Sequence, residues 1–229
     1  MDLVTGLLWF LAFLFSTTVH EAMHAWAAWR GGDPTAYHGG QVSLSPIPHV
    51  RREPIGMLVV PLITALTQGW ALGWASTPYD PYWAARYPNR AAIMALAGPV
   101  GNLLIAAAAL ILLKLGLAVG WFVPAPILNL QRLVIAPGGL ETLFGTLLSI
   151  LLVLNVLLAA FNLIPLPPLD GASVLGLFIP AFARQMREFS QNPMFSLIGL
   201  LVAWRVFPLI VQPLFSFVVW LVHPGLHYG

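Results

Sequence analysis

The chain has 229 residues and a formal net charge of +2; 59% of the residues are hydrophobic and 8% are charged. With a mean hydropathy of +0.85, this composition excludes a soluble domain and offers no basic patch for nucleic acid. The absence of cysteine excludes disulfides and a thiolate metal site. We therefore expect an integral protein of the lipid bilayer, with one domain over residues 1–229 and no nucleic-acid partner.

The first apolar segment, residues 3–29, contains the sequence His20-Glu21-Ala22-Met23-His24. Two histidines four residues apart lie on one face of a helix. This H-E-x-x-H spacing is typical of zinc-dependent hydrolases, in which the histidines bind the metal and the glutamate is the general base. Because a carboxylate and two imidazoles are costly inside a membrane helix, their presence indicates a functional site.

The region that follows, residues 31–88, does not resemble a membrane span. Between residues 31 and 54, short polar and apolar residues alternate around glycines and prolines, which predicts a β-hairpin or an irregular loop. Residues 54–79 are uncharged, but glycine and proline interrupt them repeatedly. We interpret this second stretch as a re-entrant or broken segment.

Three more apolar segments are long enough to cross a membrane, since a transmembrane helix needs about 20 residues. They cover residues 91–113, 142–164 and 195–222. Pro208 and Pro213 predict that the last helix is bent or broken. The sequence therefore predicts an all-α polytopic membrane protein, with about four transmembrane helices and a re-entrant or β-hairpin region between the first two.

Most of the arginines flank these spans on one side. Five of them lie between the first two spans: Arg30, Arg51, Arg52, Arg86 and Arg90. Arg184 and Arg187 follow the third span. By the positive-inside rule, residues 30–90 are cytoplasmic, so residues 54–79 make no net crossing. We expect a multi-pass protein of the cell membrane with its active site toward the cytoplasmic side.

A zinc site needs a third protein ligand beside the two histidines. Of the eight acidic residues, Glu21 is assigned as the base, and six others lie at span ends or in loops. The remaining acid, Asp170, follows a proline-rich break and precedes Gly171. The spacing allows two interpretations: Asp170 is the third ligand, or it caps a short helix that extends to Phe182.

Three separated motifs resemble those of the site-2 protease family of intramembrane zinc metalloproteases. They are His20–His24, the Gly-Pro-x-x-Asn stretch of residues 97–102, and residues 162–171 with their Pro-Pro-Leu-Asp-Gly ending. Residues 32–36, 44–56 and 73–75 resemble the compact bacterial branch of that family, and no PDZ-like insert is present. The resemblance spans about residues 6–175 and implies a bacterial plasma membrane.

This resemblance implies a role for each matching position. Zinc, one ion per chain, would be bound by His20, His24 and Asp170, and Glu21 corresponds to the catalytic glutamate. Asn162 corresponds to an asparagine that positions the substrate or stabilises the oxyanion, which an amide donor can do. Asn102 matches a family asparagine without a settled chemical role, and a hydrogen bond between helices explains it equally well.

The chain also departs from the family. Compact members usually continue after Gly-Trp-Ala with a proline-rich stretch, whereas this chain has Ser76-Thr77-Pro78-Tyr79. The loop around His49 also lacks the usual acidic residue directly after His-Ile. These departures affect the expected substrate contacts of the loop and leave the metal site intact. We interpret the other histidines of the chain as structural or surface residues: His38, His49, His223 and His227.

We therefore expect a metalloendopeptidase that hydrolyses a peptide bond in or near a transmembrane segment of a membrane protein, as in regulated intramembrane proteolysis. The alternative is a non-catalytic zinc-containing membrane protein that binds the transmembrane helices of a partner. Such a protein would usually lack the glutamate, and Glu21 is intact. A transporter is disfavoured because the polar residues form a closed ligand set and do not line a path. The sequence leaves the substrate and the oligomeric state open.

Overall fold

The computed structural model describes residues 2–179, 182, 186 and 193–225. Four of its helices are long and apolar enough to cross a membrane: α1 (Leu3–Arg30), α6 (Pro88–Ala118), α7 (Leu140–Asn162) and α10 (Pro193–Val222). They match the four predicted spans to within a few residues, so the predicted all-α polytopic class is confirmed. Arg184 and Arg187, which were expected to follow the third span, lie outside the described residues.

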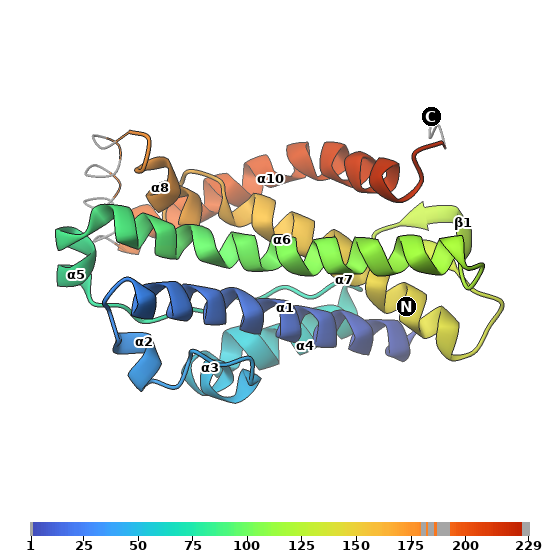
Figure 1. Cartoon of the computed structure of the whole chain (residues 1–229), viewed down its shortest axis with the longest axis horizontal. Coiled ribbons are helices and arrows are strands. Elements are labelled where there is room, and N and C mark those ends of the chain that lie inside the picture. The colour runs from blue at the N-terminus through green and yellow to red at the C-terminus, as the bar shows by residue number, and fades with distance from the viewer. Residues whose placement is uncertain (1, 180–181, 183–185, 187–192, 226–229) are drawn as a thin grey trace.

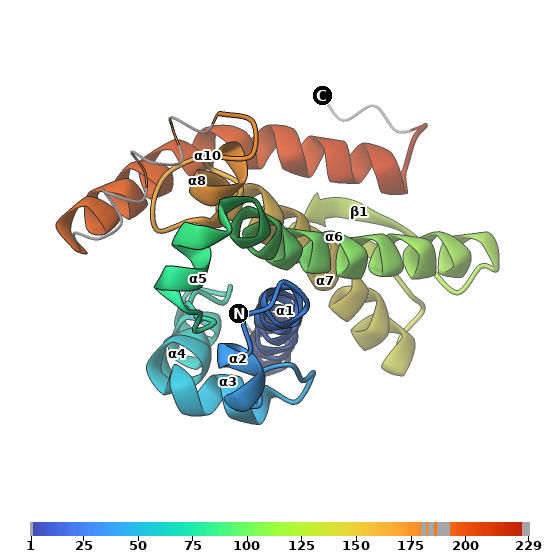
Figure 2. The same cartoon turned by 60° about the vertical axis from the view of Figure 1, so that its left-hand side comes forward.

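The helices α1, α6 and α7 form the packed centre of the bundle. The helix α6 packs against both α1 and α7, and α10 lies against α6 and α7 on the side away from α1 (Figures 1 and 2). One apolar cluster joins α6, α7, α10 and the strands, with Leu113, Leu152 and Val218 at its centre. A second joins α1, α4 and α7 around Phe13 and Ile150. Most of the surface of α10 is exposed, as expected for a helix that faces lipid.

Residues 31–54 form two short helices, α2 (Thr35–His38) and α3 (Pro46–Arg52), joined by irregular backbone; of the two predicted alternatives, the β-hairpin is wrong, and the irregular loop holds only between the helices. Ser45 caps α3 through the Ile47 N–H, and Pro46 occupies the first helical position. The hairpin lies instead between α6 and α7, where β1 (Val123–Asn129) pairs antiparallel with β2 (Arg132–Ile135). The glycines and prolines that suggested a hairpin thus separate helices.

Residues 54–79 enter the bundle and return. A π-helix, η1 (Ile55–Val59), leads into α4 (Val60–Thr67), which packs beside α1 (Figure 1). The π turn fits the sequence because Pro61 has no N–H for a regular helical bond. The chain then runs back without regular structure, and the Trp74 N–H donates to the Gly56 carbonyl over 3.1 Å.

Both ends of this excursion lie at the same end of the bundle. Asp33, just after α1, accepts hydrogen bonds from the Thr35 hydroxyl and from the Asp80 N–H. Burial raises the pKa of Asp33, but these hydrogen bonds outweigh burial and hold its pKa below the ordinary value. Asp80 in turn caps α5 (Pro81–Arg86), which leads into α6. Residues 54–79 therefore enter the bundle and leave it at the same end, as predicted for a re-entrant segment.

Two further predictions about helices are corrected. The helix that begins at Asp170, α8, ends at Leu175 and does not extend to Phe182. The helix α10 is continuous through Pro208 and Pro213, so the alternative of a broken helix is wrong, and the alternative of a bent helix stays a prediction. A helix surrounded by lipid and neighbouring helices tolerates proline, because its freed carbonyl groups find other partners or local adjustments.

Candidate metal centre

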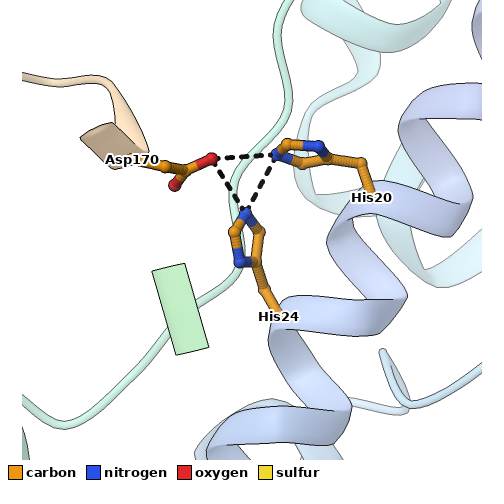
Figure 3. A group of neighbouring side chains, drawn as sticks. All are labelled: His20, His24 and Asp170. Carbon is orange, nitrogen blue, oxygen red and sulfur yellow. Dashed lines mark hydrogen bonds and ion pairs between the residues drawn. The ribbon is translucent and has the colours of Figure 1, made fainter. Parts of the chain in front are cut away.

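Two imidazoles and one carboxylate converge between α1, α6 and α8. His20 and His24 project from α1 toward Asp170, the first residue of α8 (Figure 3). The distance from Asp170 Oδ2 is 3.3 Å to His20 Nε2 and 3.4 Å to His24 Nε2, and the two Nε2 atoms are 2.9 Å apart. His24 lies six residues before the end of α1, which is about 9 Å along the axis. The centre is therefore inside the bundle but near one end.

The hydrogen bonds of the imidazoles orient their Nε2 atoms toward this centre. His24 Nδ1 lies 2.7 Å from the Met94 carbonyl oxygen, which can only accept, so His24 Nδ1 donates. His20 Nδ1 lies 2.6 Å from Asn102 Oδ1 and donates in the same way. In a neutral imidazole whose Nδ1 carries the proton, Nε2 presents its lone pair. Two such lone pairs and a carboxylate oxygen meet at one point.

This donor set fits a metal ion. Among the described residues, no hydrogen-bond donor reaches the buried Asp170 Oδ2, because the two Nε2 atoms beside it present lone pairs. Three acceptor atoms so close to one another repel unless a cation lies between them. Among the described residues, His20, His24 and Asp170 are the one group with metal-binding side chains within 4.8 Å of one another. Two histidines and one carboxylate with an open position are a known catalytic zinc arrangement.

The alternative interpretation of Asp170, a helix cap, is not supported. The residue before it, Leu169, occupies the cap position of α8, and no side chain caps the helix. The carboxylate of Asp170 faces the histidines instead (Figure 3). The sequence left this choice open because the spacing between α7 and the acid does not say where the carboxylate points.

Gly98 allows α6 to lie directly against the two imidazoles. A Cβ atom at this position would overlap His24 Nε2 and lie 2.6 Å from His20 Nε2. One turn later, a Cβ at Gly101 would meet only the flexible side chain of Met23 at 2.9 Å and Val19 at 3.5 Å. The glycine of the Ala97-Gly98-Pro99 motif is therefore part of the wall of the metal centre.

Glu21 lies beside the centre, buried, and is held by Thr77. The Thr77 hydroxyl lies 2.7 Å from Glu21 Oε2 and 3.0 Å from the Glu21 carbonyl oxygen. Glu21 and the three metal-binding side chains line one cavity of about 450 Å³, together with residues of the 75–79 stretch. Thr77 was not predicted as a site residue, although it lies where the chain departs from the family pattern.

Asn162 and Asn102 take different places around the centre. Asn162, the last residue of α7, lines the same cavity, and its amide donates to the Leu158 carbonyl oxygen over 3.0 Å. Asn102 is fully buried behind His20 and also bonds to Asn155 of α7. Asn102 therefore joins α6 to α7 through a hydrogen bond and also contacts His20 of the candidate metal centre.

The other described histidines lie away from the centre. His49 is buried with Nε2 at 3.0 Å from the Ser43 carbonyl oxygen, and His38 is exposed on α2. His223 donates from Nε2 to the Leu133 carbonyl oxygen over 2.9 Å, which joins α10 to β2. These contacts agree with the predicted structural or surface roles. His227 lies outside the described residues.

A hydrophobic bundle with a buried histidine–carboxylate centre and an adjacent glutamate defines a membrane metalloprotease, and comparison with known proteins gives the family. The chain matches the model of peptidase family M50 over residues 8–206. It therefore belongs to peptidase family M50, the site-2 protease family.

Two curated bacterial relatives agree with this assignment. The chain is 32% identical to "Putative zinc metalloprotease YwhC" of Bacillus subtilis over 220 residues, which cover 96% of this chain and 85% of the relative. It is 28% identical to "Putative zinc metalloprotease Rip2" of Mycolicibacterium smegmatis over 162 residues, which cover 71% of this chain and 53% of that relative. No solved structure matches the chain significantly.

Proposed function

We propose that this chain is a zinc-dependent intramembrane endopeptidase that cleaves a peptide bond in or near a transmembrane segment of a membrane protein. The observation that carries the proposal is the meeting of three metal-binding atoms beside a buried glutamate, in one cavity between membrane-length helices. Membership of peptidase family M50 supports it independently. Such an enzyme would act in regulated intramembrane proteolysis.

The zinc ion, one per chain, would be held by His20 Nε2, His24 Nε2 and a carboxylate oxygen of Asp170. When bound, it supplies Lewis-acid chemistry: it polarises the scissile carbonyl and lowers the pKa of a water molecule toward neutrality. Met94 and Asn102 keep the two imidazoles oriented for this role through Nδ1. The closely packed wall at Gly98 limits the space on the α6 side.

Glu21 is the general base in this proposal. Thr77 engages its Oε2 atom, and its Oε1 atom would accept a proton from the attacking water. The same carboxyl group then returns the proton to the leaving amine. The Asn162 amide, on the wall of the cavity, can donate to the carbonyl oxygen as negative charge develops there.

The substrate must lose its own helical hydrogen bonds before its carbonyl can enter the centre. The extended stretch of residues 75–79 lines the cavity next to Glu21. The Ser76 hydroxyl donates to Glu53 over 2.6 Å and accepts from Arg52 over 3.1 Å, while Thr77 bonds to Glu21. The stretch is therefore held by α3 and the residue after it on one side and by α1 on the other. We infer that an unwound substrate segment lies along this fixed stretch.

We also infer that the catalytic end of the bundle faces the cytoplasm of a bacterial cell. Arg30, Arg52 and Arg86 are exposed. Arg30 ends α1 and Arg86 ends α5, both at that end in Figure 1, and Arg52 ends α3, which packs against α1. The relatives named above are bacterial. By the positive-inside rule, this concentration of arginine belongs on the cytoplasmic side of the plasma membrane.

The test separates an enzyme from a protein that only binds zinc and partner helices. The wild type and Glu21→Gln would each be co-expressed with a panel of single-span membrane proteins, and cleavage fragments and zinc content would be measured. We expect the wild type to cut a panel member and Glu21→Gln to retain zinc while losing cleavage. Undiminished cleavage by Glu21→Gln would remove Glu21 from the mechanism.

A further inference from the structure

A chain of fully buried polar side chains runs behind His20 and joins three helices. Asn102 of α6, Asn155 of α7 and Ser16 of α1 are each completely inaccessible to solvent. Asn102 Nδ2 lies 2.8 Å from Asn155 Oδ1, and Asn155 Nδ2 lies 2.9 Å from Ser16 Oγ. Polar side chains at this depth are costly, so their mutual hydrogen bonds need an explanation.

The directions of these hydrogen bonds are fixed by backbone carbonyl groups, which can only accept. The Leu151 carbonyl oxygen lies 2.8 Å from Asn155 Nδ2, so the nitrogen of that amide must face it. The oxygen of Asn155 then faces Asn102 and requires a donor there. The Ser16 carbonyl oxygen, 3.5 Å from Asn102 Nδ2, favours the same orientation of Asn102.

This orientation determines which nitrogen of His20 carries the proton. With its Nδ2 turned to Asn155, Asn102 presents Oδ1 to His20 Nδ1 at 2.6 Å. His20 Nδ1 must therefore donate, and Nε2 keeps its lone pair for a metal. His24 reaches the same state more simply, because the Met94 carbonyl oxygen accepts directly from its Nδ1. An asparagine can rotate by 180° and reverse the outcome, whereas a carbonyl cannot.

We propose that Asn155 is a positioning residue that holds Asn102 in the orientation that keeps His20 in its metal-binding tautomer. The proposal rests on the proposed metal centre and adds a residue of α7 that touches neither the metal-binding atoms nor the cavity. Without Asn155, the Asn102 amide can turn its Nδ2 toward His20. His20 Nδ1 would then have to accept, and a proton on Nε2 would block the metal.

Zinc binding to the purified full chain in detergent tests the proposal without any substrate. The dissociation constant would be measured by competition with a fluorescent chelator. We expect Asn155→Leu to weaken zinc binding about tenfold or more, because partners of metal-bound histidines typically contribute 10- to 100-fold. Asn155→Asp in its protonated form keeps the shape, an acceptor for Asn102 and a donor for Leu151, so it should bind zinc like the wild type.

Ser149→Ala is the matched control. Ser149 is also a fully buried polar residue of α7, but it bonds to Gly145 and Leu133 and has no link to His20. We expect this variant to keep the zinc affinity of the wild type. Equal losses in Ser149→Ala and Asn155→Leu would show a general packing effect and overturn the proposal, as would unchanged affinity in Asn155→Leu.

A second measurement on the wild type does not depend on the folding of any variant. Nitrogen NMR of the zinc-loaded protein, labelled with 15N at histidine, reports which ring nitrogen carries the proton. We expect a protonated Nδ1 and a metal-bound Nε2 for His20. A proton on Nε2 would overturn the positioning role alone, whereas a wild type that binds no zinc would overturn the metal centre as well.

Discussion

The hydroxyl of Thr77 holds the buried carboxylate of Glu21 in one position. The Thr77 hydroxyl engages one carboxylate oxygen of Glu21 at 2.7 Å, and both residues line the cavity. Because Thr77 also contacts the Glu21 carbonyl oxygen at 3.0 Å, it joins the irregular stretch of residues 75–79 to α1 at this residue. A misplaced carboxylate would remain buried but would meet the attacking water less often.

We therefore expect Thr77→Val to reduce the turnover rate of cleavage and to leave KM and zinc content nearly unchanged. A hydrogen bond to a charged group contributes about 1.5–3 kcal/mol, so the reduction should be about tenfold or more. Thr77→Ser, which keeps the hydroxyl, should restore most of the rate. A Thr77→Val enzyme with the wild-type turnover rate would show that Thr77 does not position the base.

At the scale of residues, the sequence predicted those parts of the centre that follow from local spacing. His20, Glu21 and His24 lie on one helix, so a spacing of four residues was enough. Asn155 was missed because its partners come from two other helices, and sequence spacing gives no register between helices. The signal that could have found it is its occurrence in an otherwise apolar span, where a polar group needs a buried partner.

At the scale of elements, the centre depends on how closely α6 approaches α1. Gly98 is the point of contact, because the imidazole rings occupy the place of a side chain. We expect Gly98→Ala to displace α6 or the imidazoles and to weaken zinc binding strongly. Gly101→Ala is the matched control, since its methyl group meets mainly the flexible Met23 side chain. Both affinities can be measured by chelator competition.

The outcome that would contradict this account is a Gly98→Ala protein with the zinc affinity of the wild type. An equal loss of zinc affinity in Gly101→Ala and Gly98→Ala would also contradict it, because the loss would then come from the general packing of α6. Both substitutions replace a glycine by alanine within one turn of α6, so they change the intrinsic stability of the helix equally. A difference in zinc affinity between them therefore reports the contact of residue 98 with the imidazoles.

The apolar spans were predictable because length and hydropathy are properties of one segment. The short elements were not, because glycine and proline mark interruptions without saying which structure lies between them. Residues 31–54 contain the same residue types as a hairpin but form α2 and α3, and the hairpin of β1 and β2 lies elsewhere. The continuous α10 shows a similar effect, since it contains two prolines without ending at either of them.

At the scale of the whole molecule, the fold brings the metal centre, the short helices α2, α5 and α8, and the arginines that end α1 and α5 to one end (Figure 1). The hairpin and the N-terminus of α1 lie at the other end (Figures 1 and 2). The re-entrant segment contributes to this arrangement because it returns to the end from which it started, at Asp80 beside Asp33. A true crossing at residues 54–79 would separate Thr77 from Glu21.

Single cysteines in this cysteine-free chain can test the orientation. Leu44 and Tyr82 are exposed at the catalytic end, and Ile127 is exposed on β1 at the other end. We expect a membrane-impermeant thiol reagent to label Ile127→Cys in intact cells, and Leu44→Cys and Tyr82→Cys only after the membrane is opened. Labelling of Tyr82→Cys from outside, with Leu44→Cys protected, would make residues 54–79 a true crossing.

The central claim is that His20, His24 and Asp170 hold one zinc ion, and metal analysis of matched variants tests it most directly. Zinc per chain would be determined by elemental analysis after equilibration with buffered zinc, for the wild type, Asp170→Asn and Asp33→Asn. Asp33 is a buried aspartate outside the centre, bonded to Thr35 and Asp80, so it controls for loss of a buried carboxylate. We predict about one zinc per chain in the wild type and Asp33→Asn, and affinity lowered more than about tenfold in Asp170→Asn. Full zinc occupancy and unchanged affinity in Asp170→Asn would contradict the account.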